Sequence, residues 1–315
     1  MNLALTQAVK ALAQGLGFHA CGIASAYDIS RLPSERPAAQ AYRRYLKWLS
    51  QGYHANMKYM AETASLRASL SSVLPGARSY IVVLQSYFHT KRRISPIAQY
   101  AWGQDYHIHM RRRLQVIADY LQRHGHAARV VVDTAPLLEK AWAVEAGLGW
   151  IGKNTLLLNR RLGSYTFIGG VLTTAALLPD SPFMEDLCGR CQRCVEACPT
   201  AALRPYELDA RRCIAYWTIE APSLEEGMPS LEGWIFGCDI CQQVCPWNRF
   251  AHPQGEVALR PQAAVFLKPS EWAQLSPAQI KKIQKQSALR RAHPRKLLQI
   301  AHMPTQPQQR QPLKP

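Results

Sequence analysis

The chain has 315 residues, 48% of them hydrophobic, and its 38 Lys and Arg against 21 Asp and Glu give a formal net charge of +17. This length can bury a full core and leaves room for two domains. We expect no membrane partner and a cytoplasmic protein, because there is no apolar run of about eighteen residues and no secretory signal pattern at the N-terminus.

The excess of positive charge is spread over several basic clusters. They are Lys91-Arg92-Arg93, Arg111-Arg112-Arg113, Arg160-Arg161, Arg211-Arg212 and the stretch from Lys281 to Lys296. Taken singly, each cluster is better explained as a solvated surface or a basic tail than as a binding site. Their sum favours a polyanionic partner, of which RNA and DNA are the commonest.

Residues 1–177 alternate between helical and extended patterns. Apolar residues at helical spacing predict helices over 5–12, 42–49 and 114–121, the last following the Arg111–Arg113 triplet. A further helix is expected over 134–147, with Pro136 in its first turn and Gly147 at its end. Strands are expected over 79–88, 128–133, 154–159 and 164–174. The sequence therefore predicts an α+β protein that begins with an α/β domain, and without a GxGxxG or a phosphate loop nothing suggests a dinucleotide or ATP.

The composition changes at residue 178. Eight of the nine cysteines fall between Cys188 and Cys245, which predicts a ferredoxin-type segment over 178–250. Residues 251–315 form a polar remainder, with helical stretches near 270–300 and a Gln/Pro-rich end, MPTQPQQRQPLKP, that we expect to be disordered.

The cysteine spacing is the most specific signal in the chain. CGRCQRCVEACPT gives Cys188-x2-Cys191-x2-Cys194-x3-Cys198-Pro, the run that binds a [4Fe–4S] cluster in bacterial ferredoxins. GCDICQQVCPWN gives Cys238-x2-Cys241-x3-Cys245-Pro, which is one cysteine short, and Cys213 supplies the missing ligand. Because the fourth cysteine of such a run binds the other cluster, two ligand sets are predicted. They are Cys188, Cys191, Cys194 and Cys245 for one cluster, and Cys198, Cys213, Cys238 and Cys241 for the other.

Zinc and disulfides are the alternatives to iron–sulfur clusters for these cysteines. Zinc fits paired CxxC motifs but does not require the x2-x2-x3-Pro run, and disulfides do not suit a chain without an export signal. Cys21, alone in FHACGIA, is interpreted as a small buried hydrophobe. Two neighbouring clusters form a path for electrons, so the first domain should hold a redox centre or a reducible substrate.

Several stretches resemble one family. They are DYH at Asp105–His107, VDTAPLLEKAWAVEAGLGWIGKNTLLLN at 132–159, the first cysteine run, LDARRCIAYWTIE at 208–220, and GCDICQQVCPWNRFA at 237–251. Together they are similar to the epoxyqueuosine reductases, over about residues 1–250. The resemblance implies a nitroreductase-like domain that binds cobalamin, two [4Fe–4S] clusters beside it, and removal of the epoxide oxygen of epoxyqueuosine at the wobble position of tRNA.

Asp133 is the predicted general acid for the departing oxygen. Residues alone favour a helix N-cap for Asp133, at the junction of an apolar strand and a helix; the resemblance shifts the prediction to a catalytic acid whose pKa is raised by burial. Contacts with the cofactor are predicted for Asp133 and His107, for Lys153 and Asn154 of GWIGKN, and for Asp239 and Ile240 between two cysteines. DYH nearly matches the cobalamin-ligating Asp-x-His-x-x-Gly pattern, but Met110 stands at the glycine position. We therefore expect base-off cobalamin with His107 lining the pocket and not ligating cobalt.

Two alternative functions remain open on sequence grounds. Another cobalamin and iron–sulfur reductase, such as a reductive dehalogenase, would share the two-domain plan but usually carries an export signal. An electron carrier or nucleic-acid-binding module would not need a 177-residue α/β domain. The expected partners are tRNA, through phosphate contacts from Arg and Lys, and an unidentified low-potential electron donor, with the chain acting as a monomer. Residues 287–301 resemble the start of the helical repeats that many relatives carry, so any repeat region is expected to be short.

Overall fold

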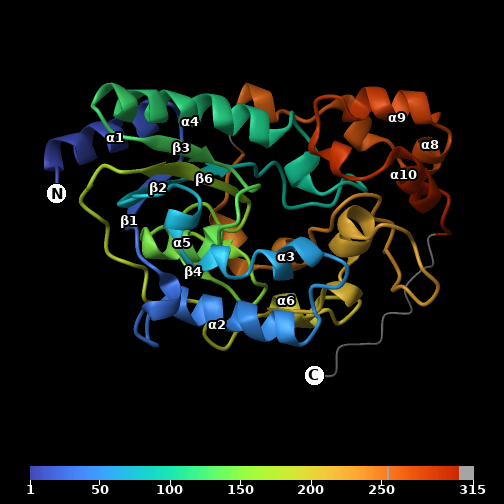
Figure 1. Cartoon of the computed structure of the whole chain (residues 1–315). Coiled ribbons are helices and arrows are strands. Elements are labelled where there is room, and N and C mark those ends of the chain that lie inside the picture. Colours follow the sequence, from blue (N-terminus) through green and yellow to red (C-terminus); the bar gives the residue numbers. More distant parts are fainter. Residues whose placement is uncertain (254, 305–315) are drawn as a thin grey trace.

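The computed structural model describes residues 1–253 and 255–304. Its centre is a four-stranded antiparallel sheet with the strand order β1-β2-β6-β3 (Figure 1). The strands are β1 (Ala20–Ser25), β2 (Ser79–Ser86), β3 (Ala128–Val131) and β6 (Thr166–Thr173). The prediction of an α+β protein is confirmed; the Gln/Pro-rich end predicted to be disordered lies, from residue 305 onward, outside the described residues.

Helices cover both faces of the sheet, so the central strand β2 is buried on both sides. Ile81 and Val83 point into one core, and Tyr80, Val82 and Leu84 into the other. A strand buried on both sides reads as a continuous apolar run, which is why SYIVVLQS was predictable. Helices α1 (Leu3–Gly15) and α4 (Tyr106–Arg123) cover the first face, and α2 (Pro37–Ser50) and α5 (Glu139–Glu145) the second, as Figure 1 shows.

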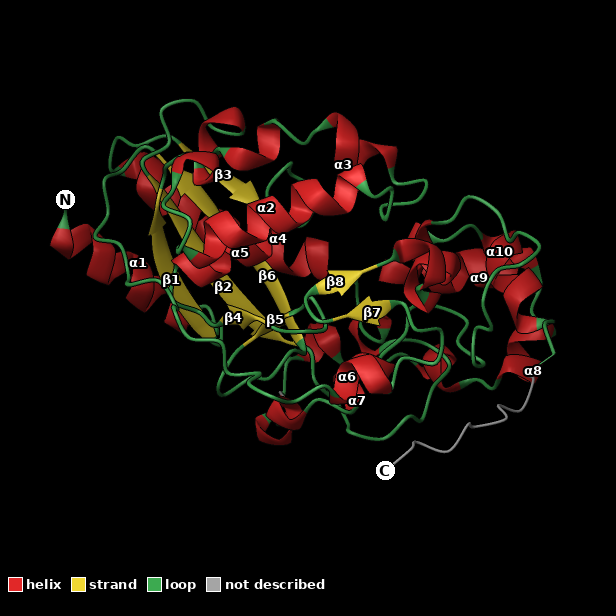
Figure 2. Cartoon of the chain, turned by 90° about the horizontal axis from the view of Figure 1, so that it is seen from below, coloured by secondary structure: helices red, strands yellow, loops and turns green. Residues whose placement is uncertain are grey.

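The remaining elements are short. The helices α3, α6 and α7 span Lys58–Glu62, Arg193–Glu196 and Ile240–Gln243, and two hairpins pair β4 (Trp150–Ile151) with β5 (Leu157–Leu158) and β7 (Leu203–Arg204) with β8 (Glu207–Leu208). The C-terminal helices are α8 (Pro269–Ala273), α9 (Pro277–Gln284) and α10 (Pro294–Ala301). In Figure 2 the β7–β8 hairpin lies between the central sheet and these C-terminal helices.

A third core joins parts of the chain that the sequence placed in different domains. Ile97 and Trp102, from the predicted first domain, pack with Trp217 and Phe236 of the cysteine-rich segment and with Trp272 of α8. The division into 1–177, 178–250 and 251–315 therefore stays a prediction about chain organisation, while the hydrophobic core crosses both boundaries. No helix in residues 1–253 and 255–304 has the length and apolar character needed to cross a bilayer.

Two predicted helix boundaries were wrong. The helix expected from residue 134 begins at Glu139, and residues 134–138 form a bent, irregular segment. Its N-cap position is Leu138, so the structure does not support Asp133 as the cap of this helix. The Arg111–Arg113 triplet lies inside α4, which begins five residues before it at Tyr106 and is capped by the side chain of Asp105.

Candidate active site and cluster sites

The first predicted cysteine set comes together around one cavity. Cys188, Cys191, Cys194 and Cys245 all line a cavity of about 210 Å³, together with Lys153 and Trp247. A structural zinc ion would instead draw four sulfurs to about 2.3 Å from a single point and leave no such space. Thiols arranged around a volume suit the corners of a cubane cluster.

The cysteines of the second set lie close enough to shift one another's pKa. Burial raises the pKa of the Cys238 thiol, and the charges of Cys213 and Cys198 raise it further. The pKa of Cys241 is raised in the same way by burial and by Cys238 and Cys213. Gly237, directly before this pair, has a φ of 71°, and a Cβ there would lie 2.5 Å from the Cβ of Ala98, so only glycine fits this approach.

Four of the six residues predicted to contact the cofactor lie beside the cysteines. Lys153 is buried, and its Nζ donates to the Gly189 carbonyl at 2.6 Å; Asn154 borders the same cavity as the first cysteine set. Asp239 is buried and accepts the Gln99 N–H at 2.8 Å; burial raises its pKa to about 7. Ile240 begins α7. These placements leave their contact with a corrin a prediction.

A larger cavity of about 880 Å³ opens between the sheet and the cysteine-rich segment. Its wall combines the turn after β3, the start of α5, residues 166–168 of β6, the inner side of α2 and the chain around β8. Aromatic side chains there are Trp48, Tyr59, Tyr106 and Phe167, and basic ones are Arg44, Lys47, Arg67, Lys140 and Arg291. Such a wall suits a large ligand with both flat apolar and polar parts.

Asp133 stands on this wall in an unusual backbone conformation. Its φ is 60°, in the left-handed region that a non-glycine residue adopts at a cost, and such strain concentrates at functional sites. Its N–H donates to Oε1 of Glu139 at 2.9 Å, which holds the turn in place. The side chain is 55% exposed, and it faces the cavity.

The Asp133 carboxylate accepts two side-chain hydrogen bonds from α4. The hydroxyl of Tyr106 lies 3.3 Å and Nε2 of His107 lies 3.1 Å from Oδ2 of Asp133. Tyr106 stacks between His107 and Phe167, with ring centroids 4.1 Å apart on each side, which fixes its orientation. The acid is therefore held by residues that precede it by 26 and 27 positions.

The predicted rise in the pKa of Asp133 was wrong. The hydrogen bond from His107 holds the pKa of this carboxyl below its ordinary value, against the opposing effect of burial. Burial alone would lower the pKa of His107, but its hydrogen bonds to Asp105 and Asp133 outweigh that effect and raise it to about 9. Burial and the charge of Asp133 raise the pKa of Glu139 to about 8. At neutral pH the protons of the site thus reside on His107 and Glu139.

Sequence reasoning missed Glu139, Asp105 and Tyr106 as site residues. The signal was present, since DYH and the LE of APLLE were among the stretches that carried the resemblance. Without the fold, nothing showed that the start of α4 lies against the turn after β3.

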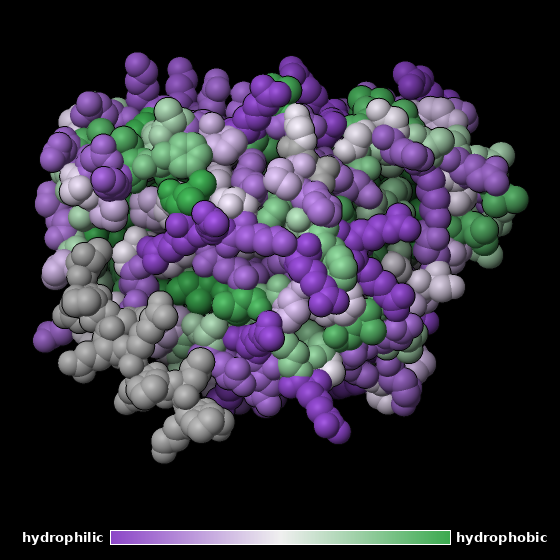
Figure 3. Space-filling view, turned by 180° about the vertical axis from the view of Figure 1, so that it is seen from behind, coloured by the Kyte–Doolittle hydropathy of each residue, from purple (hydrophilic) through white to green (hydrophobic). Residues whose placement is uncertain are grey.

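Many of the basic residues serve the structure itself. Arg111 donates to Oγ1 of Thr134 at 2.6 Å, beside Asp133, and Arg160 and Arg211 form ion pairs with acidic neighbours. Arg93 lies over the ring of Trp234. The face seen in Figure 3 is nevertheless mostly hydrophilic, with small apolar patches between long polar side chains.

A cavity lined by one cysteine set, a second group of mutually interacting cysteines, and a strained aspartate on the wall of a larger cavity are the features of an iron–sulfur protein built for redox chemistry. Residues 187–248 match the family model "4Fe-4S double cluster binding domain", and residues 67–134 match "Epoxyqueuosine reductase QueG, DUF1730". The first match confirms two iron–sulfur clusters as the predicted cofactors.

The relatives identify the family. An epoxyqueuosine reductase of Cyclobacterium marinum is 41% identical over 302 residues, covering 91% of this chain and 92% of that protein. One of Pseudomonas aeruginosa is 41% identical over 271 residues, covering 82% and 72%. The chain belongs to the epoxyqueuosine reductase family, which confirms the resemblance read from its motifs.

Solved structures show the same fold. A selenomethionine-labelled epoxyqueuosine reductase aligns with a TM-score of 0.82 at 24% identity, covering 95% of this chain and 80% of that one. An epoxyqueuosine reductase crystallised with an epoxyqueuosine-modified tRNA-Tyr stem loop aligns with a TM-score of 0.80 at 25% identity, with the same coverage.

Proposed function

We propose that this chain reduces epoxyqueuosine at the wobble position of tRNA to queuosine, with Asp133 delivering a proton to the epoxide oxygen. Family membership supports the substrate, since the relatives are named for it and one solved neighbour holds a modified tRNA stem loop. The observation that carries the assignment of the acid is Asp133 itself, held in a left-handed turn on the wall of the large cavity.

Cobalamin is the proposed third cofactor, in a domain whose fold we propose to be nitroreductase-like. The large cavity fits it in size and chemistry, because about 880 Å³ lined by aromatic and basic side chains can hold a large macrocycle that carries polar amide groups. Tyr106, Phe167 and Lys140 would contact the macrocycle. When bound, cobalamin supplies a reduced cobalt centre that reacts at carbon.

We propose that cobalamin binds base-off, and the bonding of His107 supports the part of this proposal that denies it a place as a cobalt ligand. Both ring nitrogens are engaged, Nδ1 with Asp105 at 2.7 Å and Nε2 with Asp133 at 3.1 Å. A histidine held in this way has no free nitrogen to ligate a metal. His107 is therefore proposed to act on Asp133, at the edge of the pocket.

The proton and electron requirements fit this arrangement. Converting an epoxide to an alkene and water takes two electrons and two protons. The electrons come one at a time through the clusters from a low-potential donor. Asp133 gives one proton to the oxygen as its bond to carbon breaks, and the hydroxyl of Tyr106 holds the carboxylate that results. The second proton, taken up from solvent, lets the oxygen leave as water.

Basic residues at the cavity rim are proposed to hold the tRNA backbone. Arg44 and Lys47 of α2 and Arg291 line this cavity. Arg and Lys contacts to phosphate position a nucleic acid without reading its sequence. The modified nucleoside would be turned out of the anticodon loop into the cavity. We propose that the chain acts as a monomer in the cytoplasm, which sedimentation of the holoenzyme with and without tRNA would test.

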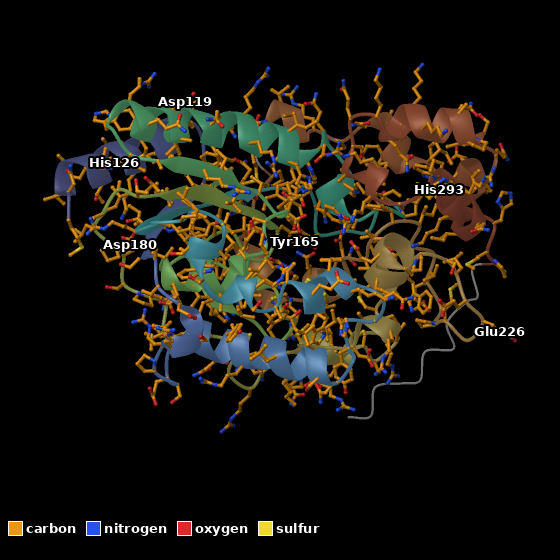
Figure 4. The ribbon with its side chains drawn as sticks, viewed as in Figure 1. Asp119, His126, Tyr165, Asp180, Glu226 and His293 are labelled. Atoms are coloured by element: carbon orange, nitrogen blue, oxygen red, sulfur yellow. The ribbon has the colours of Figure 1, made fainter. Side chains whose placement is uncertain are left out.

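An anaerobic turnover assay tests the function. Reconstituted protein, cobalamin and a chemical reductant are mixed with epoxyqueuosine-containing tRNA, and digested nucleosides are read by mass spectrometry. We expect loss of one oxygen, and a rate lowered about 10²–10⁴-fold in Asp133→Asn. The control is Asp119→Asn, an exposed aspartate on the outer side of α4 (Figure 4) that should leave the rate unchanged.

Two results would redirect the assignment. No conversion by protein with both clusters and the corrin in place would leave a cobalamin reductase of another substrate, the alternative that the sequence left open. Conversion by Asp133→Asn at the wild-type rate would keep the function and remove Asp133 as the acid.

A further inference from the structure

The DYH stretch forms one end of a chain of charged groups that leads to Asp133. Asp105 is 1% exposed and caps α4, where its Oδ1 accepts the His107 N–H at 3.0 Å. The same Oδ1 lies 2.7 Å from Nδ1 of His107. The other ring nitrogen of His107 contacts Asp133 at 3.1 Å. The imidazole thus lies between two carboxylates, one buried and one facing the cavity.

The buried end of this chain is tied to the C-terminal segment. Nη2 of Arg290 forms an ion pair with Oδ2 of Asp105 at 2.7 Å, and the Asp105 N–H donates to the Gln286 carbonyl at 2.8 Å. Burial at 1% exposure opposes ionisation of Asp105, but the hydrogen bonds and charge of His107, with a smaller contribution from Arg290, hold the pKa of this carboxyl below its ordinary value. An ionised Asp105 in turn favours the doubly protonated imidazolium of His107, in which both nitrogens donate.

We propose that His107, oriented by Asp105, is the positioning residue that supplies the proton with which Asp133 protonates the epoxide oxygen. This inference rests on the proposed function. The Nε2–H bond of His107 breaks as an O–H bond forms on Asp133, and the proton of Asp133 passes to the oxygen. His107 becomes neutral and recovers its proton from solvent; no electron moves in this step.

The charge states support this role. A carboxyl whose pKa is held low is ionised at neutral pH and cannot by itself provide a proton, whereas the raised pKa of its partner His107 makes that residue the nearest proton source. The other titratable or charged groups that interact with Asp133 or His107 are Tyr59, Tyr100, Tyr106, Glu139 and Arg291, and Arg290 acts through Asp105. Glu139 also holds a proton at neutral pH, so the test must separate it from His107.

The experiment compares His107→Gln with His109→Gln. Glutamine keeps a hydrogen-bond donor but carries no titrating proton, and His109 lies on the same helix beside Arg113 and Glu256, away from Asp133. Single-turnover rates are measured from pH 6 to pH 10 on prereduced holoenzyme, so that the pH dependence of the reductant does not enter. Absorbance of the clusters verifies folding.

We expect the wild-type rate to fall above pH 9, following the pKa of about 9 of His107. His107→Gln should lose about 10²-fold in rate, with KM for tRNA unchanged and with no fall above pH 9. His109→Gln should match wild type. Histidine NMR of the protein gives a readout independent of turnover, in which Asp105→Asn should move the pKa of His107 toward 6.5.

Three outcomes would overturn the proposal while leaving the function intact. The first is a His107→Gln rate within twofold of wild type, and the second is a loss of rate in His107→Gln that keeps the alkaline fall. The third is disappearance of the fall in Glu139→Gln, which would transfer the role to Glu139. A wild-type protein that converts no epoxyqueuosine, with cofactors in place, contradicts the function itself and is recognised separately.

Discussion

The cysteine-rich segment and the cavity around Asp133 encode their sites in opposite ways. Seven of the eight predicted cluster ligands stand in two runs with spacings of two or three residues. The acid site draws Asp105, His107, Asp133, Glu139 and Arg290 from distant parts of the chain. Cluster ligands at short spacings can be recognised in the sequence. A site whose residues come from distant parts of the chain can be recognised only when the packing of helix and sheet is known.

The largest expected effect tests the cysteine side of this contrast. In Cys245→Ser one ligand of the first set is lost, and in Cys238→Ser one ligand of the second. Each variant should retain about four of about eight irons per chain and lose turnover, because the electron path is interrupted. Iron analysis with electron paramagnetic resonance of the reduced protein gives the measurement.

The two variants should lose different clusters. Cys245→Ser is expected to keep the spectrum of the cluster bound by Cys198, Cys213, Cys238 and Cys241. Cys238→Ser is expected to keep the spectrum of the cluster bound by the first set. The cavity lined by Cys188, Cys191, Cys194 and Cys245 supports the assignment of Cys245 to the cluster of the first run. Loss of the same signal in both variants would contradict that assignment. Cys21→Ser, which lies outside both sets, is the control.

The same contrast accounts for how much the sequence could predict. β2 and β6 were predicted within two residues because their apolar runs are buried on both faces. The helix after Asp133 was placed five residues early. Pro136 was interpreted as a proline in the first helical turn, but it lies in the irregular segment that follows the left-handed residue Asp133. The pKa direction of Asp133 failed for a related reason: its controlling partner, His107, is remote in sequence.

A smaller effect is expected from Glu139, which acts on the backbone of Asp133. Glu139→Ala removes the acceptor of the Asp133 N–H, 2.9 Å away, and leaves a left-handed residue unsupported. A displaced carboxylate should lower the single-turnover rate about tenfold or more. Glu139→Gln keeps an acceptor and resembles the protonated side chain, so its rate should stay within about threefold of wild type at pH 7. Equal losses in the two variants would show that the carboxyl group itself, and not its hold on the turn, is required.

The smallest effect concerns stability, and its sign follows from the raised pKa of His107. A histidine with a pKa of about 9 in the folded state and about 6.5 in the unfolded chain stabilises the fold fully below pH 6.5. That contribution is lost as pH rises through 9, because the imidazolium that pairs with Asp105 and Asp133 loses its proton. Since Asp133 is half exposed, we expect on the order of 1–2 kcal/mol, which corresponds to an apparent Tm lower by a few degrees at pH 9.5 than at pH 6.5. The measurement is the difference between wild type and His107→Gln at one scan rate, which cancels other groups that titrate in this range. A difference that does not change between the two pH values would mean that His107 is not charged in the folded protein, and the proton supply inferred from its two carboxylates would have to be abandoned.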